Sequence, residues 1–417
     1  MLINSKVSFL VAILMSMQFS LIAQNSTVSP YTRYGYGVIA DHSFSGGRSM
    51  GGIGYGLRTP NQINPMNPAS YSCMDSLTFL FDVGATLQLS LLNDEENSHR
   101  NLNGNLMYLA MQFPLSHTIA MSAGLHPYSH TGYNFNIVNN DDDISHIDNF
   151  SGKGGLNEVY VGLSIDIWKK RLALGANVGY MFGIIEHNSK TSYSSEIIGA
   201  LYTIKKVNLR NMKYNLGMQY THPLSKTERI VLGLTYSPKI KFSSVSYDFV
   251  STDQYARSIL SADTVRNKGF SIPNSFGAGI SYEKDHKWII AADLSYQEWS
   301  KAQFFEENET YKNRHKIVIG SEYIPNSLSR KYLSRVKYRA GFNYSNSYLR
   351  FNGFGYKEYG VSLGAGFPML DNRSYINASF EYVRVVPEIS SLISEQYFRF
   401  TLSCSFNEFW FFKRRMD

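Results

Sequence analysis

The stretch LTFLFDVGATLQLSL, residues 77–91, alternates between two kinds of side chain. Its odd positions are apolar, while most of its even positions are small or polar. An alternation of period two predicts a β-strand with one apolar face. The stretch is also longer than the roughly five or six residues of most soluble strands, and it is long enough to cross a bilayer as a tilted strand.

The same alternation returns along the chain, and the connections between such stretches alternate in length. Further examples lie at residues 159–167, 172–182, 288–297 and 398–406. Short connections are expected at residues 114–117, 169–170, 223–226, 283–286, 326–331 and 368–373, and long polar ones near 136–151, 188–206, 248–268 and 300–313. Outer-membrane barrels combine short periplasmic turns with longer extracellular loops, and this regularity argues against a soluble β-sandwich.

We therefore predict an all-β fold, a 14-stranded antiparallel transmembrane β-barrel with an N-terminal plug inside its lumen. The strands are expected at residues 77–91, 102–113, 118–135, 152–167, 171–187, 207–222, 228–247, 269–283, 287–299, 314–324, 333–347, 351–366, 374–387 and 395–406. An even number of strands places both chain ends in the periplasm.

The composition agrees with a barrel wall. Charged residues make up 18% of the chain and aromatic residues 14%, whereas an ordinary globular chain is about 25% charged. The formal net charge is +7, but the basic residues do not cluster into a stripe along the sequence, so we expect no nucleic-acid partner. No Gly-x-x-x-x-Gly-Lys run is present, which argues against nucleotide-driven transport.

The first residues have the features of a secretory signal peptide. Lys6 supplies a positive charge, an apolar run begins at Val7, and cleavage is expected after Ala23. We predict a signal peptide over residues 1–23, with a retained helical anchor as the alternative. After this segment no apolar run is long enough for a membrane-spanning helix.

Residues 24–75 differ from the barrel because they are rich in Gly, Pro and Asn, which mark turns and close backbone approaches. We predict that they form a compact plug in the periplasmic half of the lumen, since irregular backbone at membrane depth is tolerated only inside protein or a wet cavity. The barrel is expected to occupy residues 76–406. Residues 407–417 are expected to form a periplasmic tail whose aromatic residues meet the membrane interface.

The strand number, the N-terminal segment and an Asn-Pro-Ala motif before the first strand together resemble the FadL-like family of outer-membrane transporters for long-chain fatty acids and aromatic hydrocarbons. The residues that carry the resemblance are 48–52, Arg-Ser-Met-Gly-Gly, and 67–69. The resemblance implies a hatch that plugs the lumen, and it assigns these residues to the substrate passage: Gly51, Gly52, Asn67, Pro68 and Ala69. A structural turn is the alternative for the Asn-Pro-Ala motif, because Asn-Pro often starts a turn.

The third predicted strand contains Pro127, which cannot donate a backbone hydrogen bond to a neighbouring strand. A closed barrel has no edge, so we expect a kink or a gap in the wall at this point. In FadL-like transporters a kink in the third strand forms a lateral exit to the membrane. The resemblance therefore places a lateral gate at Gly124, Pro127 and Gly132, with a local bulge that leaves no opening as the alternative.

The resemblance implies an outer-membrane channel for passive uptake of hydrophobic small molecules such as long-chain fatty acids. The alternative is a non-transporting barrel that acts in protein secretion, surface attachment or docking, because the opening residues 29–35 differ from those of the transporters. A transporter should have an apolar pocket beside the plug and a side opening, whereas a docking barrel should have a fully hydrogen-bonded wall and a sealed lumen. The expected partners are outer-membrane lipids, a hydrophobic substrate and the outer-membrane insertion machinery, and we expect a monomer.

Several charged residues fall on the inward, polar faces of predicted strands, because a charge that faces lipid is costly. They are Asp82, Asp166, Asp293, Glu381 and Arg399. Buried charges are normally paired, so we expect pairs among them or with the plug residues Arg33, Arg48 and Arg58. A role in the selectivity of the passage is the alternative.

No constellation supports catalysis, a metal site or a cofactor, and we predict that the protein is not an enzyme. The histidines at 117, 126 and 130 lack partners at a suitable spacing. The acidic run 141–143 lacks the Gly and the distal Glu of a calcium loop and is expected to be solvated. Cys73 and Cys404 are both expected at the periplasmic rim, where a disulfide or two separate small apolar residues are the two alternatives.

Overall fold

The computed structural model describes most of the chain. The described residues are 27–93, 98–139, 145–168, 171–193, 199–252, 258–266, 269–304, 311–351, 353–390 and 392–409. The predicted signal peptide, the acidic run 141–143 and residues 410–417 of the predicted tail lie outside them.

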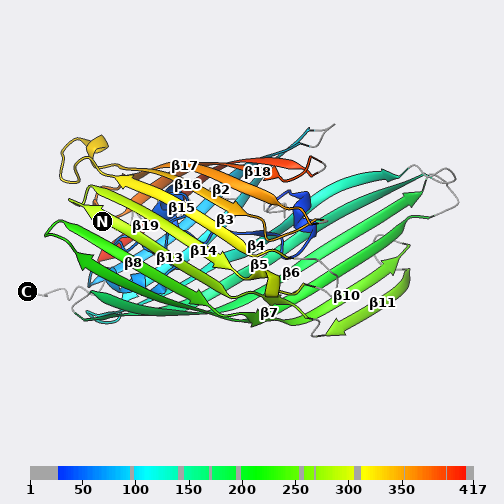
Figure 1. Cartoon of the computed structure of the whole chain (residues 1–417), viewed down its shortest axis with the longest axis horizontal. Coiled ribbons are helices and arrows are strands. Elements are labelled where there is room, and N and C mark those ends of the chain that lie inside the picture. The colour runs from blue at the N-terminus through cyan, green and yellow to red at the C-terminus, as the bar shows by residue number, and fades with distance from the viewer. Residues whose placement is uncertain are drawn as a thin grey trace, which may run out of the picture.

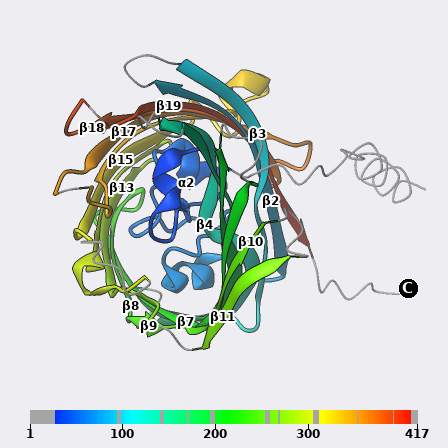
Figure 2. The same cartoon turned by 90° about the vertical axis from the view of Figure 1, so that its right-hand side faces the viewer.

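Fourteen strands form a closed antiparallel barrel, as predicted (Figures 1 and 2). In wall order they are β2 (Thr78–Asn93), β3 (Ser98–Pro114), β4 (Ile119–Asn139), β5 (His146–Ile167), β6 (Leu172–Tyr193), β7 (Leu201–Pro223), β8 (Glu228–Ser237), β13 (Ser275–Lys284), β14 (Trp288–Gln297), β15 (Arg314–Tyr323), β16 (Lys337–Asn346), β17 (Tyr356–Pro368), β18 (Tyr375–Pro387) and β19 (Ser394–Phe409). The ring closes where β19 pairs with β2.

The apolar faces of the strands point out of the barrel. In β5, the outward residues Val159, Leu163 and Ile167 are 40% to 50% exposed, while the alternate residues Tyr160 and Ser164 are buried. This arrangement is the reverse of a soluble protein and is the one that a lipid-facing wall requires. Among the described helices, none is long and apolar enough to cross a membrane.

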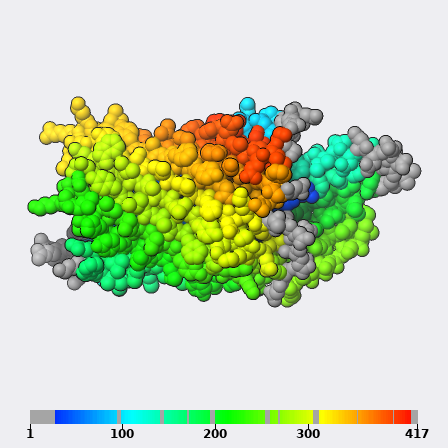
Figure 3. Space-filling view, in the orientation of Figure 1, coloured from blue at the N-terminus to red at the C-terminus, as the bar shows by residue number. Residues whose placement is uncertain are grey.

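The wall is uneven in height. Strands β5 to β7 contain 22 or 23 residues, whereas β13 to β16 contain 10 each. The long strands therefore extend beyond the rest of the barrel at one end (Figures 1 and 3). The end with short turns is the predicted periplasmic end, and the extension lies at the predicted extracellular end.

The prediction of one strand over residues 228–247 was wrong. Strand β8 ends at Ser237 because Pro238, the next residue, has no backbone N–H for the ladder. The chain then forms β9 (Ile240–Lys241) and β10 (Ser243–Ser251), and β10 pairs with the outer half of β7. Strand β11 (Ile259–Arg266) completes a hairpin within the region predicted as a polar loop, and β12 (Ser271–Ile272) pairs with β9.

Residues 27–76 lie inside the ring of strands (Figure 2). Their short elements are the 3-10 helix η1 (Pro30–Arg33), β1 (Val38–Ile39), helix α2 (Ser45–Ser49) and the 3-10 helix η2 (Pro68–Cys73). The part with α2 and η2 lies in the periplasmic half, where Arg58 pairs with Asp166 near the periplasmic end of β5. The part before it runs towards the extracellular end, so the placement of the whole plug in the periplasmic half was wrong. Two further 3-10 helices, η3 (Trp299–Lys301) and η4 (Tyr332–Ser334), lie in connections of the wall.

The cysteines do not form the disulfide that was considered, because both thiols are free. Cys404 pairs with Val83, whereas the same ladder reaches the periplasmic rim at Phe409 and Thr78. At about 3.3 Å per residue, Cys404 therefore lies roughly 16 Å above the rim. Cys73 ends helix η2 inside the barrel. Strand β19 also continues to Phe409, three residues beyond the predicted end of the barrel at 406.

Candidate functional site

The barrel wall parts between β3 and β4. The two strands pair only from Leu109–Leu125 to Pro114–Ala120, although both continue towards the extracellular end. On their other sides, β3 remains paired with β2, and β4 with β5. The β4–β5 ladder shifts at Pro127, the residue that led us to expect a kink. We call the unpaired stretch between β3 and β4 the side gap.

A segment of the plug covers the open edge of β4. Val38 and Ile39 pair with His130 and Ser129 in an antiparallel bridge, and Ala40 N donates a hydrogen bond of 2.9 Å to Tyr128 O. Farther along the edge, Ser29 N donates to Gly132 O at 2.9 Å. We call residues 29–40 the gate segment. It supplies from inside the barrel the strand pairing that β3 does not supply.

Gly37 allows the gate segment to approach β4 closely. Its φ is +80°, and a Cβ atom at this position would lie 2.2 Å from the carbonyl oxygen of His130. Glycine adopts this left-handed backbone region without a steric cost. The glycine at position 37 is therefore explained by the close contact of the gate segment with the backbone of β4.

Replacing Gly37 by Ala should loosen the gate segment, because the new methyl group has no room beside β4. A cost of about 1–2 kcal/mol predicts roughly tenfold faster amide hydrogen exchange at residues 128–132. The matched control is Gly353→Ala. Gly353 also has a positive φ, +89°, but a Cβ atom there would meet nothing within 4 Å beyond its chain neighbours in the described part of the chain. Equal exchange at residues 128–132 in both variants would contradict a specific contact.

The gate segment is anchored at the extracellular end by Tyr36, whose side chain is fully buried. The Tyr36 hydroxyl donates to Gln303 O at 2.8 Å, and Tyr36 N donates to the Tyr348 hydroxyl at 3.1 Å. That hydroxyl in turn donates to Gly37 O at 2.7 Å. Trp299 and Phe304 pack against the Tyr36 ring. The segment is thus held by β4 on one side and by extracellular loops on the other.

A cavity of about 1130 Å³ lies beside the gate segment at the side gap. We call it the vestibule. It is lined by the gate segment and by both strands that part, with apolar side chains that include Leu102, Phe135 and Ile393. Arg33 and Arg100 are the cations among its described lining residues, which include no carboxylate. The Arg33 guanidinium lies 3.8 Å from the centre of the Phe150 ring. The vestibule therefore combines apolar surface with positive charge.

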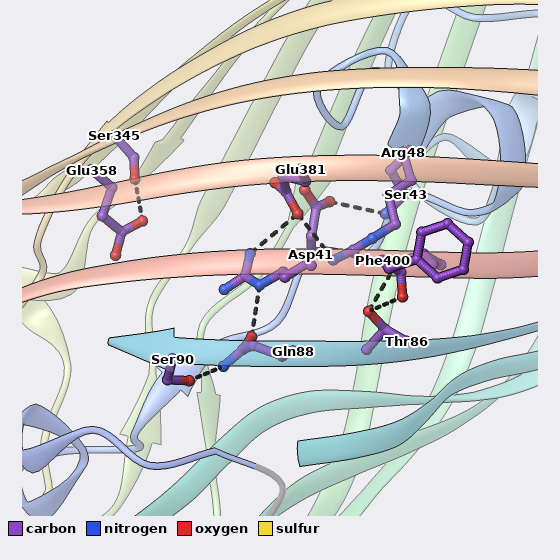
Figure 4. Close-up of polar contacts among 12 residues, drawn as sticks. Asp41, Ser43, Arg48, Thr86, Gln88, Ser90, Ser345, Glu358, Glu381 and Phe400 are labelled. Carbon is purple, nitrogen blue, oxygen red and sulfur yellow. Dashed lines mark hydrogen bonds and ion pairs between the residues drawn. The ribbon is translucent and has the colours of Figure 1, made fainter. Parts of the chain in front are cut away.

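A smaller cavity of about 110 Å³, the inner pocket, lies on the lumen side of the gate segment. In its charged wall, Glu381 forms ion pairs with Arg399 at 3.3 Å and with Arg48 at 3.4 Å. Figure 4 shows Glu381 and Arg48 in this wall. Arg399 also donates to Gln88 at 2.7 Å. The Nε and Nη1 atoms of Arg48 are buried and have no hydrogen-bond acceptor in the described part of the chain. The described lining of the inner pocket thus combines carboxylates with cations, whereas that of the vestibule has cations alone.

The inward charges predicted from the sequence mostly bind the plug to the wall. Asp166 pairs with Arg58 at 2.5 Å, and Asp293 accepts hydrogen bonds from Gly54 N and Tyr55 N at 2.7 and 2.8 Å. Glu381 and Arg399 line the inner pocket. Asp82 accepts a hydrogen bond from the Tyr108 hydroxyl at 3.2 Å. Arg33 is the one expected plug partner that pairs with none of them in the described residues.

None of the predicted passage residues of the plug is among the residues that line the vestibule or the inner pocket. Asn67 accepts a hydrogen bond from Ala69 N and donates to Tyr55 O, so the Asn-Pro-Ala motif forms the cap of η2. Gly51 lies against the backbone of Phe342, and Gly52 beside the Asp41 carboxylate. These contacts favour the structural alternative. A lateral gate at Gly124, Pro127 and Gly132 stays a prediction, although Gly132 does contact the gate segment.

A buried polar cluster beside the side gap was not predicted from the sequence. His42 of the plug and His126 of β4 approach at 3.2 Å between their Nδ1 atoms. His126 faces Glu158, which pairs with Lys213 at 2.7 Å. The described residues contain no group of three metal-binding side chains. The contact between His42 and His126 joins the plug to the kinked strand β4. The position of His126 next to Pro127 was the one sequence feature that could have indicated this contact.

Comparison with protein-family models identifies the family of this chain. A family model, BamG, matches residues 5–417. The chain belongs to the BamG family. No curated protein matches this BamG-family sequence.

Solved structures similar to this BamG-family barrel include a hydrocarbon channel, a toluene transporter and a FadL homologue. The CymD monoaromatic hydrocarbon channel is 15% identical, with a TM-score of 0.60 over 88% of this chain and 98% of its own. The Pseudomonas putida toluene transporter TodX is 16% identical, with a TM-score of 0.61 over 89% and 99%. A Pseudomonas aeruginosa FadL homologue is 14% identical, with a TM-score of 0.61 over 89% and 99%. The resemblance to FadL-like barrels is thus confirmed for the fold.

Proposed function

We propose that this BamG-family protein is an outer-membrane channel for the passive passage of hydrophobic small molecules, with long-chain fatty acids as a substrate class. The observation that carries the proposal is the side gap. The wall separates between β3 and β4 at the vestibule, whose lining includes apolar side chains. A molecule that enters the vestibule needs to displace only the gate segment to reach the bilayer.

The part of the plug that contains α2 and η2, residues 44–74, is called the lower plug. Its contacts with the wall favour a route through the side gap over a route straight along the barrel axis. The lower plug is fixed to opposite parts of the wall, by Arg58 to Asp166 of β5 and by Gly54 and Tyr55 to Asp293 of β14. Removing it would expose several buried polar groups without partners, which is costly. The gate segment needs to break only an edge pairing and its aromatic anchor. The alternative of a docking barrel called for an uninterrupted wall, and the interruption between β3 and β4 disfavours it.

Uptake by whole cells tests the proposal, because the outer membrane then keeps its native lipid barrier. A host that lacks its own hydrocarbon channels would express the barrel, and the entry of labelled oleate and toluene would be measured. We expect saturable uptake that is faster than in cells with an empty vector. Uptake equal to the empty-vector level for both compounds, with correctly inserted barrel, would rule the proposal out.

Arg33 is expected to favour substrates that carry a carboxylate. A charged hydrogen bond contributes about 1.5–3 kcal/mol, so Arg33→Met should lower oleate uptake roughly tenfold. Toluene uptake should change much less, because a cation–π contact contributes only about 0.5–1 kcal/mol at an exposed site and the Phe150 ring already covers one face of the guanidinium. Arg33→Lys is the control and should retain part of the oleate uptake. An equal loss for oleate and toluene would show that Arg33 only holds the fold.

A further inference from the structure

Two adjacent turns at the periplasmic end form one exposed surface. The turn at residues 324–336 joins β15 to β16 and contains η4, and the turn at residues 369–374 joins β17 to β18. They are connected where the Tyr332 hydroxyl donates to Pro368 O at 3.1 Å and where the Arg335 guanidinium donates to Asn372. We call the two turns together the rim patch. The longer turn stands out from the barrel at the upper left of Figures 1 and 3.

The rim patch exposes large apolar side chains. Leu328 is 93% exposed, Leu333 68% and Leu370 104%. Neither the barrel lumen nor the lipid-facing wall uses these residues, because they belong to turns outside the strands. Exposed apolar residues that gather in one place indicate a surface that binds something.

Cations accompany the apolar side chains. They are Arg330, Lys331, Arg335 and Arg373. Two lie over aromatic rings, Arg335 at 5.5 Å from the centre of Tyr332 and Arg373 at 3.7 Å from that of Phe409. The patch contains one carboxylate, Asp371, whose oxygen accepts a hydrogen bond from Arg373 N, so the four cations give the patch a net positive charge.

The rim patch lies at the depth of lipid head groups. Trp288 and Tyr323, at the periplasmic ends of β14 and β15, stack with their ring centres 4.1 Å apart. Outward aromatic residues at strand ends mark the membrane interface. The turn at residues 324–336 begins directly after Tyr323. Its leucines can therefore enter the interface while its cations lie among phosphates.

We propose that the rim patch binds anionic phospholipids of the inner leaflet of the outer membrane. Apolar residues combined with Lys and Arg form the kind of surface that lies in the interface of an anionic membrane. A lipid surface is favoured over a protein partner because the other turns at this end also expose apolar residues. Leu115, Trp168 and Leu224 are 51% to 60% exposed and lie on three further turns around the rim. A lipid annulus contacts every side of the rim, whereas one protein contacts only one side.

Lipid preference is the measurement that tests this proposal. Full-length barrel would be reconstituted in vesicles of phosphatidylethanolamine alone and of phosphatidylethanolamine mixed with phosphatidylglycerol. Native mass spectrometry then counts the retained phosphatidylglycerol, and thermal unfolding is followed in both vesicles. We expect selective retention of phosphatidylglycerol and a higher Tm in its presence, because a ligand that binds only the folded state stabilises it.

Charge-reversal variants test whether the cations of the rim patch bind the phosphatidylglycerol. Cations near an anionic membrane surface are attracted to it, so Arg330→Glu with Lys331→Glu should lower phosphatidylglycerol retention at least tenfold. Leu328→Ser with Leu370→Ser should also lower it. The matched control is Lys312→Glu with Arg350→Glu, two exposed cations in extracellular connections, which should retain the wild-type preference. A wild-type barrel that shows no preference for phosphatidylglycerol, or a preference that survives the rim reversal, would overturn the proposal and would favour a protein partner.

Discussion

A disulfide between the gate segment and β4 is expected to stop uptake of hydrophobic compounds. Ala40 N donates to Tyr128 O, so the neighbouring pair Ile39–Ser129 is a non-hydrogen-bonded pair, in which side chains lie closest. Such a pair has the Cβ separation that a disulfide needs. In a background with Cys73→Ser and Cys404→Ser, the oxidised Ile39→Cys, Ser129→Cys variant should take up oleate and toluene at the empty-vector rate. Reduction should restore uptake.

A second disulfide separates movement of the gate segment from movement of the whole plug. Ser45 and Ser405 lie with their hydroxyl oxygens 2.9 Å apart and join the lower plug to β19. In the same cysteine-free background, the oxidised Ser45→Cys, Ser405→Cys variant should retain uptake, because the proposed route leaves the lower plug in place. Normal uptake through a barrel whose Ile39–Ser129 bridge is fully formed would disprove the gate segment as the moving part.

Loss of Arg58 is expected to release the lower plug. The Arg58 guanidinium bonds Asp166 at 2.5 Å, Ala69 O at 2.6 Å and Ser72 at 3.2 Å, and both charged side chains are at most 5% exposed. Removing one member of a buried ion pair costs about 3–5 kcal/mol, because the other charge stays buried without a partner. Arg58→Met should therefore make residues 44–74 accessible to protease and should raise ionic conductance in planar bilayers.

Two variants show whether the unpaired charge is the cause. Asp166→Asn in the Arg58→Met background removes the orphaned carboxylate, so it should recover much of the protection from protease. Lys284→Met breaks an ion pair with Glu228 at the half-exposed surface and should leave both protease sensitivity and conductance unchanged. If Arg58→Met and the double variant had equal conductance and protease sensitivity, the lost hydrogen bonds to Ala69 and Ser72 would account for the release of the plug, and the unpaired charge would not.

The barrel could be predicted from the sequence because the pattern that specifies a wall strand lies within a short stretch of residues. A wall strand needs apolar residues at every second position, and that pattern is visible in any short window. The prediction failed at residues 228–247, where the alternation continues through Pro238 but the chain leaves β8 and crosses to the outer half of β7. A period of two indicates a strand but does not indicate which neighbour the strand joins.

Only one part of the candidate site, the kinked strand β4, could be predicted from the sequence. Pro127 marked the strand that loses its neighbour, since a residue without an N–H cannot extend a ladder. The cover over that edge was not predictable, because Val38 and Ile39 pair with residues about ninety positions later and have no repeating pattern of their own. The contact of His42 with His126 is equally remote in sequence. Contacts made by a plug depend on the wall around it, which a linear sequence does not describe.

The closed ring restricts the order in which the molecule can assemble. The plug is made first, but Ser29 hydrogen-bonds Glu395 at 2.7 Å across 366 residues, and the seam that encloses the plug joins β2 to β19, the first and last wall strands. A finished ring leaves no wide entry for a folded segment of about fifty residues with buried ion pairs. The plug must therefore already lie against the open sheet when the last strand arrives. Such long-range pairing predicts slow folding, limited by closure of the seam.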